Sequence, residues 1–132
     1  MDTLLIDDDA IGVFLTERLL KREGFSTDIA SFSSAEEALA FLQQASESTF
    51  PHVIFLDVNM PVMDGWEFLD AFRTLPLEQP VCVFILTSSI NPEDIDKATH
   101  YQEVRGYFSK PLDKPNVQRM QSLLHEVGDY QY

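Results

Sequence analysis

Charged and hydroxyl side chains follow four apolar runs of the sequence, close to the point where each run ends: Asp7-Asp8-Asp9, Asp57, Thr87 and Lys110. Carboxylates held within ~5 Å of one another repel by roughly 3 kcal/mol at an effective dielectric constant near 20. A cluster of this kind therefore takes up protons or binds a cation. If the four run ends meet in space, the sequence predicts an acidic cation site with a lysine and a threonine beside it.

The donor types favour a particular cation and a particular reaction. Mg²⁺ prefers oxygen ligands, and it is bound by one or two carboxylates while water or phosphate completes its coordination. Lys110 would add a second positive charge, and Thr87 would add a hydroxyl donor. Together these groups would stabilise a phosphoryl group carried by one of the carboxylates. Aspartyl phosphates are known covalent intermediates, so an Asp can be that carrier.

The elements that must position these residues alternate along the chain. Apolar runs predict strands over 3–6, 26–32, 52–56, 81–86 and 104–108. Amphipathic or capped segments predict helices over 10–22, from 35 onward, 66–75, 94–101 and 115–127. Regular alternation of apolar strands with helices indicates a parallel sheet covered by helices on both faces. The chain is too short for a (β/α)₈ barrel, which leaves a doubly wound five-stranded sheet.

In a doubly wound sheet the ligand site lies beyond the carboxyl ends of the strands, where the strand order reverses. In the order 2-1-3-4-5, the first and third strands flank that point. The acidic run 7–9 and Asp57 are therefore expected to converge although they lie far apart in the sequence.

Two helices have residues whose placement can be predicted from periodicity. The segment 10–22 puts Ile11, Phe14 or Leu15, and Leu19 on one helical face, and Asp9 stands where it could cap this helix. The last helix is expected to turn four apolar residues inward: Val117, Met120, Leu123 and Leu124.

Composition excludes several classes of protein. The 132 residues are 45% hydrophobic and 23% charged, which is typical of one globular domain spanning 1–132. Lys and Arg number 9 against 22 Asp and Glu, and the net charge of −13 disfavours binding to nucleic acid or to a membrane surface. Cys82, the single cysteine, lies in an apolar run and is expected to be a buried thiol. No apolar run approaches the length of a membrane span and no secretory signal is visible, so we expect a cytoplasmic protein.

Four stretches of the chain together resemble the receiver domain of bacterial two-component response regulators, the CheY-like family: Leu4–Asp9, Phe55–Gly65, Leu86–Ser89 and Gly106–Pro111. The resemblance covers nearly the whole chain, and the stretch D-V-N-M-P-V-M-D-G is highly specific for the family. It implies a flavodoxin-like α/β fold, with a five-stranded parallel sheet in the order 2-1-3-4-5 and helices on both faces, and a single receiver domain over 1–132.

The resemblance implies a role for each acidic residue. Asp57 matches the aspartate that is phosphorylated. Asp7 and Asp8 match the acidic pair that holds Mg²⁺ together with Asp57, with Asp8 as a direct ligand and Asp7 acting through water. The main-chain carbonyl of Asn59 matches a further metal ligand, and Asp9 is an additional acidic residue beyond the pair.

Roles for four further residues follow from the same resemblance. Thr87 matches the hydroxyl that bonds a phosphoryl oxygen, and Lys110 matches the lysine that pairs with the phosphate. Pro111 matches a proline that is usually preceded by a cis peptide bond. Tyr107 matches the aromatic residue that changes rotamer when the hydroxyl residue moves inward.

The function implied by the resemblance is that of a stand-alone response regulator. It would accept a phosphoryl group from a sensor histidine kinase or a histidine phosphotransfer protein, and would then change the surface of its fourth helix, fifth strand and fifth helix to signal to a protein partner. It would not be an enzyme beyond its own phosphorylation and dephosphorylation. We expect a monomer or a weak phosphorylation-dependent dimer that does not contact nucleic acid directly.

Three other functions fit parts of the pattern. A phosphohydrolase of the haloacid-dehalogenase type also uses a strand-end Asp with Mg²⁺, but it needs a second Asp two positions later, where this chain has Asn59, and a cap for which the chain has no room. An FMN-binding flavodoxin-like module would need a Ser/Thr/Gly-rich loop after the first strand. A pseudo-receiver that only binds a partner would not need the intact set of site residues.

Overall fold

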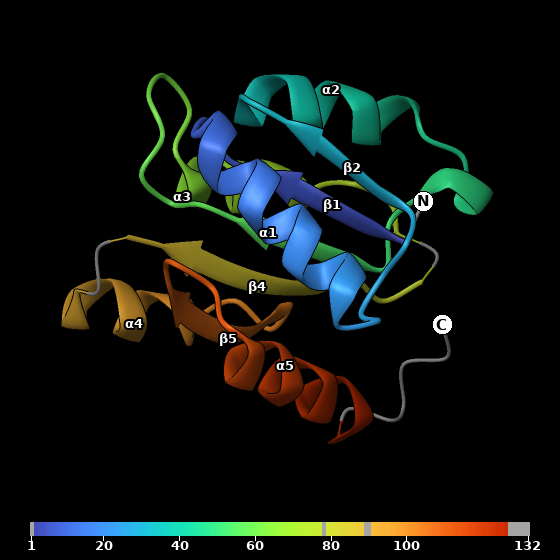
Figure 1. Cartoon of the computed structure of the whole chain (residues 1–132). Coiled ribbons are helices and arrows are strands. Elements are labelled where there is room, and N and C mark those ends of the chain that lie inside the picture. The colour runs from blue at the N-terminus through green and yellow to red at the C-terminus, as the bar shows by residue number, and fades with distance from the viewer. Residues whose placement is uncertain (1, 78, 89–90, 127–132) are drawn as a thin grey trace.

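The computed structural model describes residues 2–77, 79–88 and 91–126 (Figure 1). Strands and helices alternate within these residues, as the sequence predicts: β1 (Thr3–Ile6), α1 (Ala10–Arg22), β2 (Ile29–Phe32), α2 (Ala35–Gln44), the 3₁₀ turn η1 (Glu47–Thr49), β3 (Val53–Leu56), α3 (Gly65–Phe72), β4 (Cys82–Thr87), α4 (Pro92–Ala98), β5 (Val104–Ser109) and α5 (Lys114–Glu126).

The described strands form one parallel sheet in the order β2-β1-β3-β4-β5, which confirms the predicted fold class. β1 lies at the switch point, paired with β2 on one side and with β3 on the other. Helices α1 and α5 cover one face of the sheet, and α2, α3 and α4 cover the other (Figure 1). The carboxyl ends of β1 and β3 therefore lie side by side at the same edge of the sheet, as the predicted site requires.

The core consists of two apolar clusters, one on each face of the sheet. Alternate residues of β4 divide between them, with Val83 and Ile85 facing α2 and α3 while Phe84 and Leu86 face α1 and α5. The three central strands are buried along their whole length, as expected for strands with helices on both sides. Cys82 is 1% exposed, which confirms the expected buried thiol, and its burial raises the pKa of the thiol to about 12.

The apolar face predicted for α1 is confirmed only at Leu19, which is buried, and is wrong for the other residues. Ile11, Phe14 and Leu15 are 73%, 56% and 55% exposed, while Leu20 is completely buried. Apolar residues occur on more than one side of this helix, and Val13 also stands on the side that packs against the sheet. Helical periodicity is satisfied by either set, so only the docking of α1 on the sheet decides which set is buried.

The expected helix ends differ from the structure because two helices close as tighter turns. After α3, the N–H groups of Thr74 and Leu75 bond three residues back, to Ala71 and Phe72. Residues 99–101 do the same after α4. These 3₁₀-type bonds extend the helical path by about a turn without continuing the α-helix, so the sequence pattern looks longer than the helix. Val127, the last residue of the expected final helix, lies outside the described residues.

The N-cap residues of α2 and α1 behave differently. The Ser34 hydroxyl accepts a hydrogen bond from the Glu37 N–H at 3.2 Å, as expected of an N-cap. Asp9 occupies the N-cap position of α1, but its side chain makes no capping hydrogen bond. Across the part of the chain that the structure covers, no helix has both the length and the apolar composition needed to cross a bilayer.

The loop after β3 holds one strained residue. Val62 has φ of 67°, in the left-handed region that β-branched side chains rarely adopt, and its side chain is 87% exposed. Because the Val62 side chain is exposed, it gains little packing energy that could offset this backbone strain. The left-handed conformation costs a non-glycine residue about 1–2 kcal/mol.

We expect Val62→Asn to stabilise the protein by about 1 kcal/mol, because Asn tolerates the left-handed conformation. Val62→Thr, which keeps the branched Cβ, is the matched control and should leave stability nearly unchanged. Urea unfolding of the three proteins measures the difference. A loss of stability in Val62→Asn would contradict the assigned strain.

Candidate functional site

Asp7 and Asp57 lie next to each other at the carboxyl ends of β1 and β3. The sheet register continues into both residues, since the Asp7 N–H donates to the Phe32 carbonyl at 3.1 Å and the Asp57 N–H donates to the Ile6 carbonyl at 3.0 Å. The two aspartates are 9% and 6% exposed. Adjacent parallel strands thus hold two nearly buried carboxylates at the edge predicted from the sequence.

Lys110 bridges these two carboxylates. Its Nζ lies 2.5 Å from Asp7 Oδ2 and 3.0 Å from Asp57 Oδ2. The backbone of Lys110 is fixed by a hydrogen bond from its N–H to the Thr87 carbonyl at 2.8 Å, and the Lys110–Pro111 peptide bond is cis. Lys110 follows β5, so its side chain reaches past the end of β4 to place a positive charge at the switch point.

The second oxygen of each carboxylate accepts from a backbone N–H two residues further along the chain. Asp57 Oδ1 accepts from Asn59 at 3.0 Å, and Asp7 Oδ1 accepts from Asp9 at 2.9 Å. Each turn after a strand therefore orients its own aspartate. The carboxylates are held in place before any ligand arrives.

Burial and pairing act in opposite directions on these charges. Burial raises the pKa of Asp57 above its usual value, although the Asn59 N–H and Lys110 both lower it. Burial lowers the pKa of Lys110, but its hydrogen bonds and ion pairs with Asp7 and Asp57 outweigh burial and raise that pKa above its usual value. Lys110 is therefore held in its charged form by the same two carboxylates whose repulsion it relieves.

Asp8 completes an acidic cluster at the mouth of the site. Asp7, Asp8 and Asp57 each place one carboxylate oxygen within 4.8 Å of the others, and Asp8 is exposed. With Lys110 as the neighbouring cation, the cluster keeps an excess of negative charge. An all-oxygen donor set with an open, solvent-facing side suits Mg²⁺ or Mn²⁺, so these residues fit a divalent cation.

Asp9 takes no part in this cluster. Its carboxylate lies over α1, so that a Cβ added at Gly12 would stand 2.9 Å from Asp9 Oδ2. The sequence run of three aspartates therefore divides in the structure, with Asp7 and Asp8 turned toward Asp57 and Asp9 turned toward the helix.

Thr87 is fully buried at the end of β4, and its hydroxyl accepts a hydrogen bond from Asn59 Nδ2 at 3.1 Å. The resemblance implies a role for the main-chain carbonyl of Asn59, and the structure adds this side-chain contact. The Asn59 position two residues after Asp57 hinted at proximity, but only the β3–β4 pairing places its amide beside Thr87.

Tyr107 stands on the same face of the sheet as Thr87. Thr87 pairs with Ser109, and Tyr107, two residues earlier on β5, pairs with Ile85. The Tyr107 ring is half-buried against the α2–α3 side of the core. Burial raises the pKa of its hydroxyl above the usual range, and the carboxylates of Asp94 and Asp57 raise it further.

Comparison with known proteins agrees with this geometry. Residues 3–121 match the family model described as the response regulator receiver domain. The chain belongs to this family.

Individual relatives show the same likeness. The response regulator Rcp1 of Synechocystis sp. is 30% identical over 89% of this chain and 81% of its own length. A two-component response regulator from Cytophaga hutchinsonii superimposes with a TM-score of 0.82 at 33% identity, over 97% of this chain and 96% of its own. The Mn²⁺-bound form of Rcp1 superimposes with a TM-score of 0.73 at 27% identity, over 94% of this chain and 92% of its own.

Membership of the family implies several general properties. Receiver domains are signalling domains rather than enzymes in general, and they are phosphorylated by histidine kinases or phosphotransfer proteins. They bind Mg²⁺ or Mn²⁺ at an acidic pocket, and this chain has an acidic cluster at the corresponding edge of its sheet.

If the acidic cluster binds Mg²⁺, the metal should stabilise the fold by mass action. The free energy of unfolding should rise by about 2.7 kcal/mol at a free Mg²⁺ concentration of about a hundred times the dissociation constant. Asp8→Ala should remove most of this gain, whereas Asp9→Ala, the neighbouring aspartate outside the cluster, should retain it. Denaturant unfolding with and without MgCl₂ measures the gain. A wild-type protein indifferent to Mg²⁺, or an equal gain in Asp8→Ala, would count against the site.

Proposed function

We propose that the chain acts as a single receiver domain that accepts a phosphoryl group on Asp57 and thereby changes the surface formed by α4, β5 and α5. The donor is the phosphohistidine of a sensor histidine kinase or of a histidine phosphotransfer protein, and the changed surface signals to a protein partner. The observation that carries the proposal is the pairing of Lys110 with Asp57 beside Asp7 and Asp8. The Asp57 carboxylate therefore lies next to both a lysine cation and a candidate metal site.

The transfer is a displacement at phosphorus. A carboxylate oxygen of Asp57 forms the new P–O bond, and the P–N bond of the donor breaks. The electron pair of that bond returns to the ring nitrogen, so a donor protonated on its other nitrogen leaves as neutral imidazole. Asp57 is suited to attack because the Asn59 N–H and Lys110 orient both of its oxygens.

Charge is the main obstacle to this reaction, because an anionic phosphoryl group must approach three carboxylates. Lys110 Nζ can follow the phosphoryl oxygens once it is released from Asp57, and it remains paired with Asp7. Asp8, Asp57 and the main-chain carbonyl of Asn59 would hold Mg²⁺ directly, and Asp7 would hold it through water. Bound Mg²⁺ would supply the positive charge that offsets the phosphoryl oxygens.

The exposed apolar face of α1 supports a protein as the donor. Phe14 lines a hollow of about 300 Å³ together with Asp7 and Asp8, so apolar surface continues up to the mouth of the site. A small-molecule donor would need no such surface. Exposed apolar side chains beside a reactive group are typical of protein contact regions.

Transmission begins at Thr87. Phosphorylation adds charge of about −1.5 to −2 and new acceptor oxygens at Asp57. The Thr87 hydroxyl accepts from Asn59 Nδ2, so its own O–H can donate to one of these oxygens when the side chain moves inward. Its movement vacates space on the face of the sheet that it shares with Tyr107, and the Tyr107 ring is the group that fills this space.

The proposed acceptor can be tested directly. Incubation with acetyl phosphate and Mg²⁺ should add one phosphate, seen by intact-protein mass spectrometry and released by hydroxylamine. Asp57→Asn should abolish this addition, because the amide is a poor nucleophile. Asp9→Asn is the matched control and should be phosphorylated like the wild type. Phosphate that persists in Asp57→Asn would place the acceptor elsewhere.

The proposed switch predicts a change at one side chain. NMR or crystallography of the protein with and without beryllofluoride and Mg²⁺ should show the Tyr107 ring moving inward, with accompanying shifts on α4 and β5. Thr87→Ala should uncouple the ring from beryllofluoride, because no hydroxyl is then present to bond the fluorine atoms that stand in for the phosphoryl oxygens. An unchanged Tyr107 rotamer would contradict the switch and leave the phosphoacceptor site unaffected.

A further inference from the structure

Four side chains make a chain of ring and cation contacts between α3 and the end of α4. Lys97 Nζ lies 5.0 Å from the centre of the Trp66 ring, and the Trp66 and Tyr101 rings lie 5.7 Å apart at an angle of 31°. Arg73 Cζ lies 4.3 Å from the centre of the Tyr101 ring. Trp66 and Arg73 belong to α3 and its C-cap, whereas Lys97 and Tyr101 belong to α4 and the turn that follows it. We call these four residues the α3–α4 cluster.

Hydrogen bonds reinforce the cluster on its Tyr101 side. The Tyr101 hydroxyl donates to Asp70 Oδ1 at 2.8 Å. Arg73 Nη2 donates to the His100 carbonyl at 2.8 Å, and Arg73 Nε donates to Glu103 Oε1 at 3.2 Å. Burial and the neighbouring Asp70 carboxylate raise the pKa of Tyr101 to about 12, so the hydroxyl keeps the proton that it donates. Both the ring and the cation are therefore held in one geometry.

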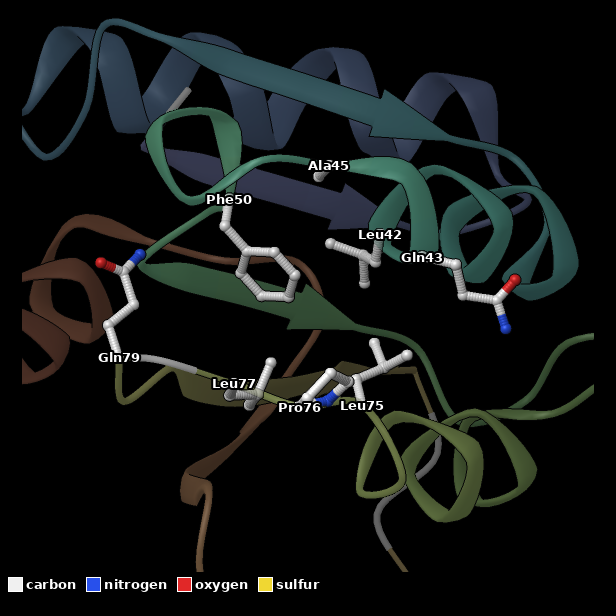
Figure 2. Close-up of a pocket in the computed structure, with 8 residues that line it drawn as sticks. All are labelled: Leu42, Gln43, Ala45, Phe50, Leu75, Pro76, Leu77 and Gln79. Carbon is white, nitrogen blue, oxygen red and sulfur yellow. The ribbon is translucent and has the colours of Figure 1, made fainter.

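The cluster joins α4 to a part of the molecule that is itself fixed. Trp66 and Tyr101 are 8% and 7% exposed, and both belong to the apolar core on this face of the sheet. On the other side of α3, Figure 2 shows the segment Leu75–Leu77 facing Leu42 and Phe50 across a hollow of about 290 Å³. Helix α3 is thus held between the cluster and the α2 side of the core, and it is a rigid support for the end of α4.

The first turn of α4 has a different environment. Glu93 is exposed and Ile95 is 41% exposed, whereas the buried residue of this helix, Ala98, lies in the last turn. Burial and then the Asp94 carboxylate raise the pKa of Tyr107, so Asp94 lies near that ring. The last turn of α4 is therefore packed and bonded to α3, while the first turn faces solvent and the proposed switch residue.

We propose that the α3–α4 cluster is a pivot, which holds the last turn of α4 on α3 and lets the first turn move by itself. This inference builds on the proposed function, in which an inward turn of the Tyr107 ring changes the surroundings of Asp94. The first turn of α4 then reorients about the cluster, and the contacts of Trp66 with Tyr101 are kept. Arg73 and Lys97 are positioning residues, because they act by holding the two rings.

Native-state hydrogen exchange of the unphosphorylated full chain tests the pivot first. The Ile95 amide, bonded to the Asn91 carbonyl, reports on the first turn of α4. The Tyr101 amide, bonded to the Ala98 carbonyl, reports on the end that the cluster holds. We expect the Tyr101 amide to be protected about tenfold or more beyond the Ile95 amide, since a cation–aromatic contact and charged hydrogen bonds must break before it opens.

Three variants separate the cluster from general stability. Arg73→Met keeps the apolar stem but removes the cation and its two hydrogen bonds, so it should lower the protection of Tyr101 to about that of Ile95. Tyr101→Phe keeps the ring and removes the bond to Asp70, so it should cause a smaller loss of about two- to tenfold. Arg22→Met is the matched control on α1, where the arginine side chain is 72% exposed, and should leave both amides unchanged.

A second measurement uses beryllofluoride with Mg²⁺ as the stand-in for the phosphoryl group. In the wild type, NMR shifts within α4 should be confined to the first turn, and the indole N–H signal of Trp66 should stay in place. In Arg73→Met the shifts should extend to Trp66, because α4 is no longer held at its last turn. A purely structural role for Arg73 would lower stability without redistributing these shifts.

Three results would overturn the pivot. They are equal protection of the Ile95 and Tyr101 amides in the wild type, protection of Tyr101 that survives in Arg73→Met, and beryllofluoride shifts at Trp66 as large as those in the first turn of α4. If Arg73→Met fails to fold, Tyr101→Phe supplies the comparison. The absence of any beryllofluoride response would contradict the proposed function instead, and the exchange data would still decide whether the cluster holds α4.

Discussion

The structure depends on a single electrostatic constraint at the switch point of the sheet. Asp7 and Asp57 are nearly buried and adjacent, and their shared counter-ion is Lys110, which comes from the end of β5. Two carboxylates at this distance would otherwise repel each other in a region with little access to water. The lysine therefore ties three strand ends together, and it leaves the site with an excess of negative charge that a divalent cation can neutralise.

The rest of the fold serves to hold these charges in position. Central strands buried on both faces resist displacement, because any shift would disturb two packed cores at once. The turns after β1 and β3 use their own N–H groups to orient Asp7 and Asp57. The rigid strands thus position the carboxylates, and the short loops orient them. This arrangement is expected where a reactive group must stay fixed.

The proposed movement involves a different part of the site. Thr87 and Asn59 are joined by one neutral hydrogen bond, which contributes about 1 kcal/mol. Tyr107 is only half-buried, and β5 is an edge strand with solvent on one side. These contacts cost less to change than those of Asp57 and Lys110, so under the proposed function a change at the site would pass toward β5 and α4 rather than into the central sheet.

The sequence pattern alone indicated the parallel sheet, the helices on both faces and the identity of the strand-end residues, whereas the strand order 2-1-3-4-5 was implied by the resemblance to receiver domains. It could do so because buried parallel strands are continuous apolar runs and because strand ends in such a sheet meet at one edge. Tertiary structure alone decided three other features. Helix α1 could bury either of two apolar stripes, and its docking exposed Ile11, Phe14 and Leu15. The Asn59 amide reaches Thr87 only because β3 and β4 are neighbours. The α3–α4 cluster forms because the last turn of α4 lies beside α3, and no local pattern records which side chains two separate helices bring together.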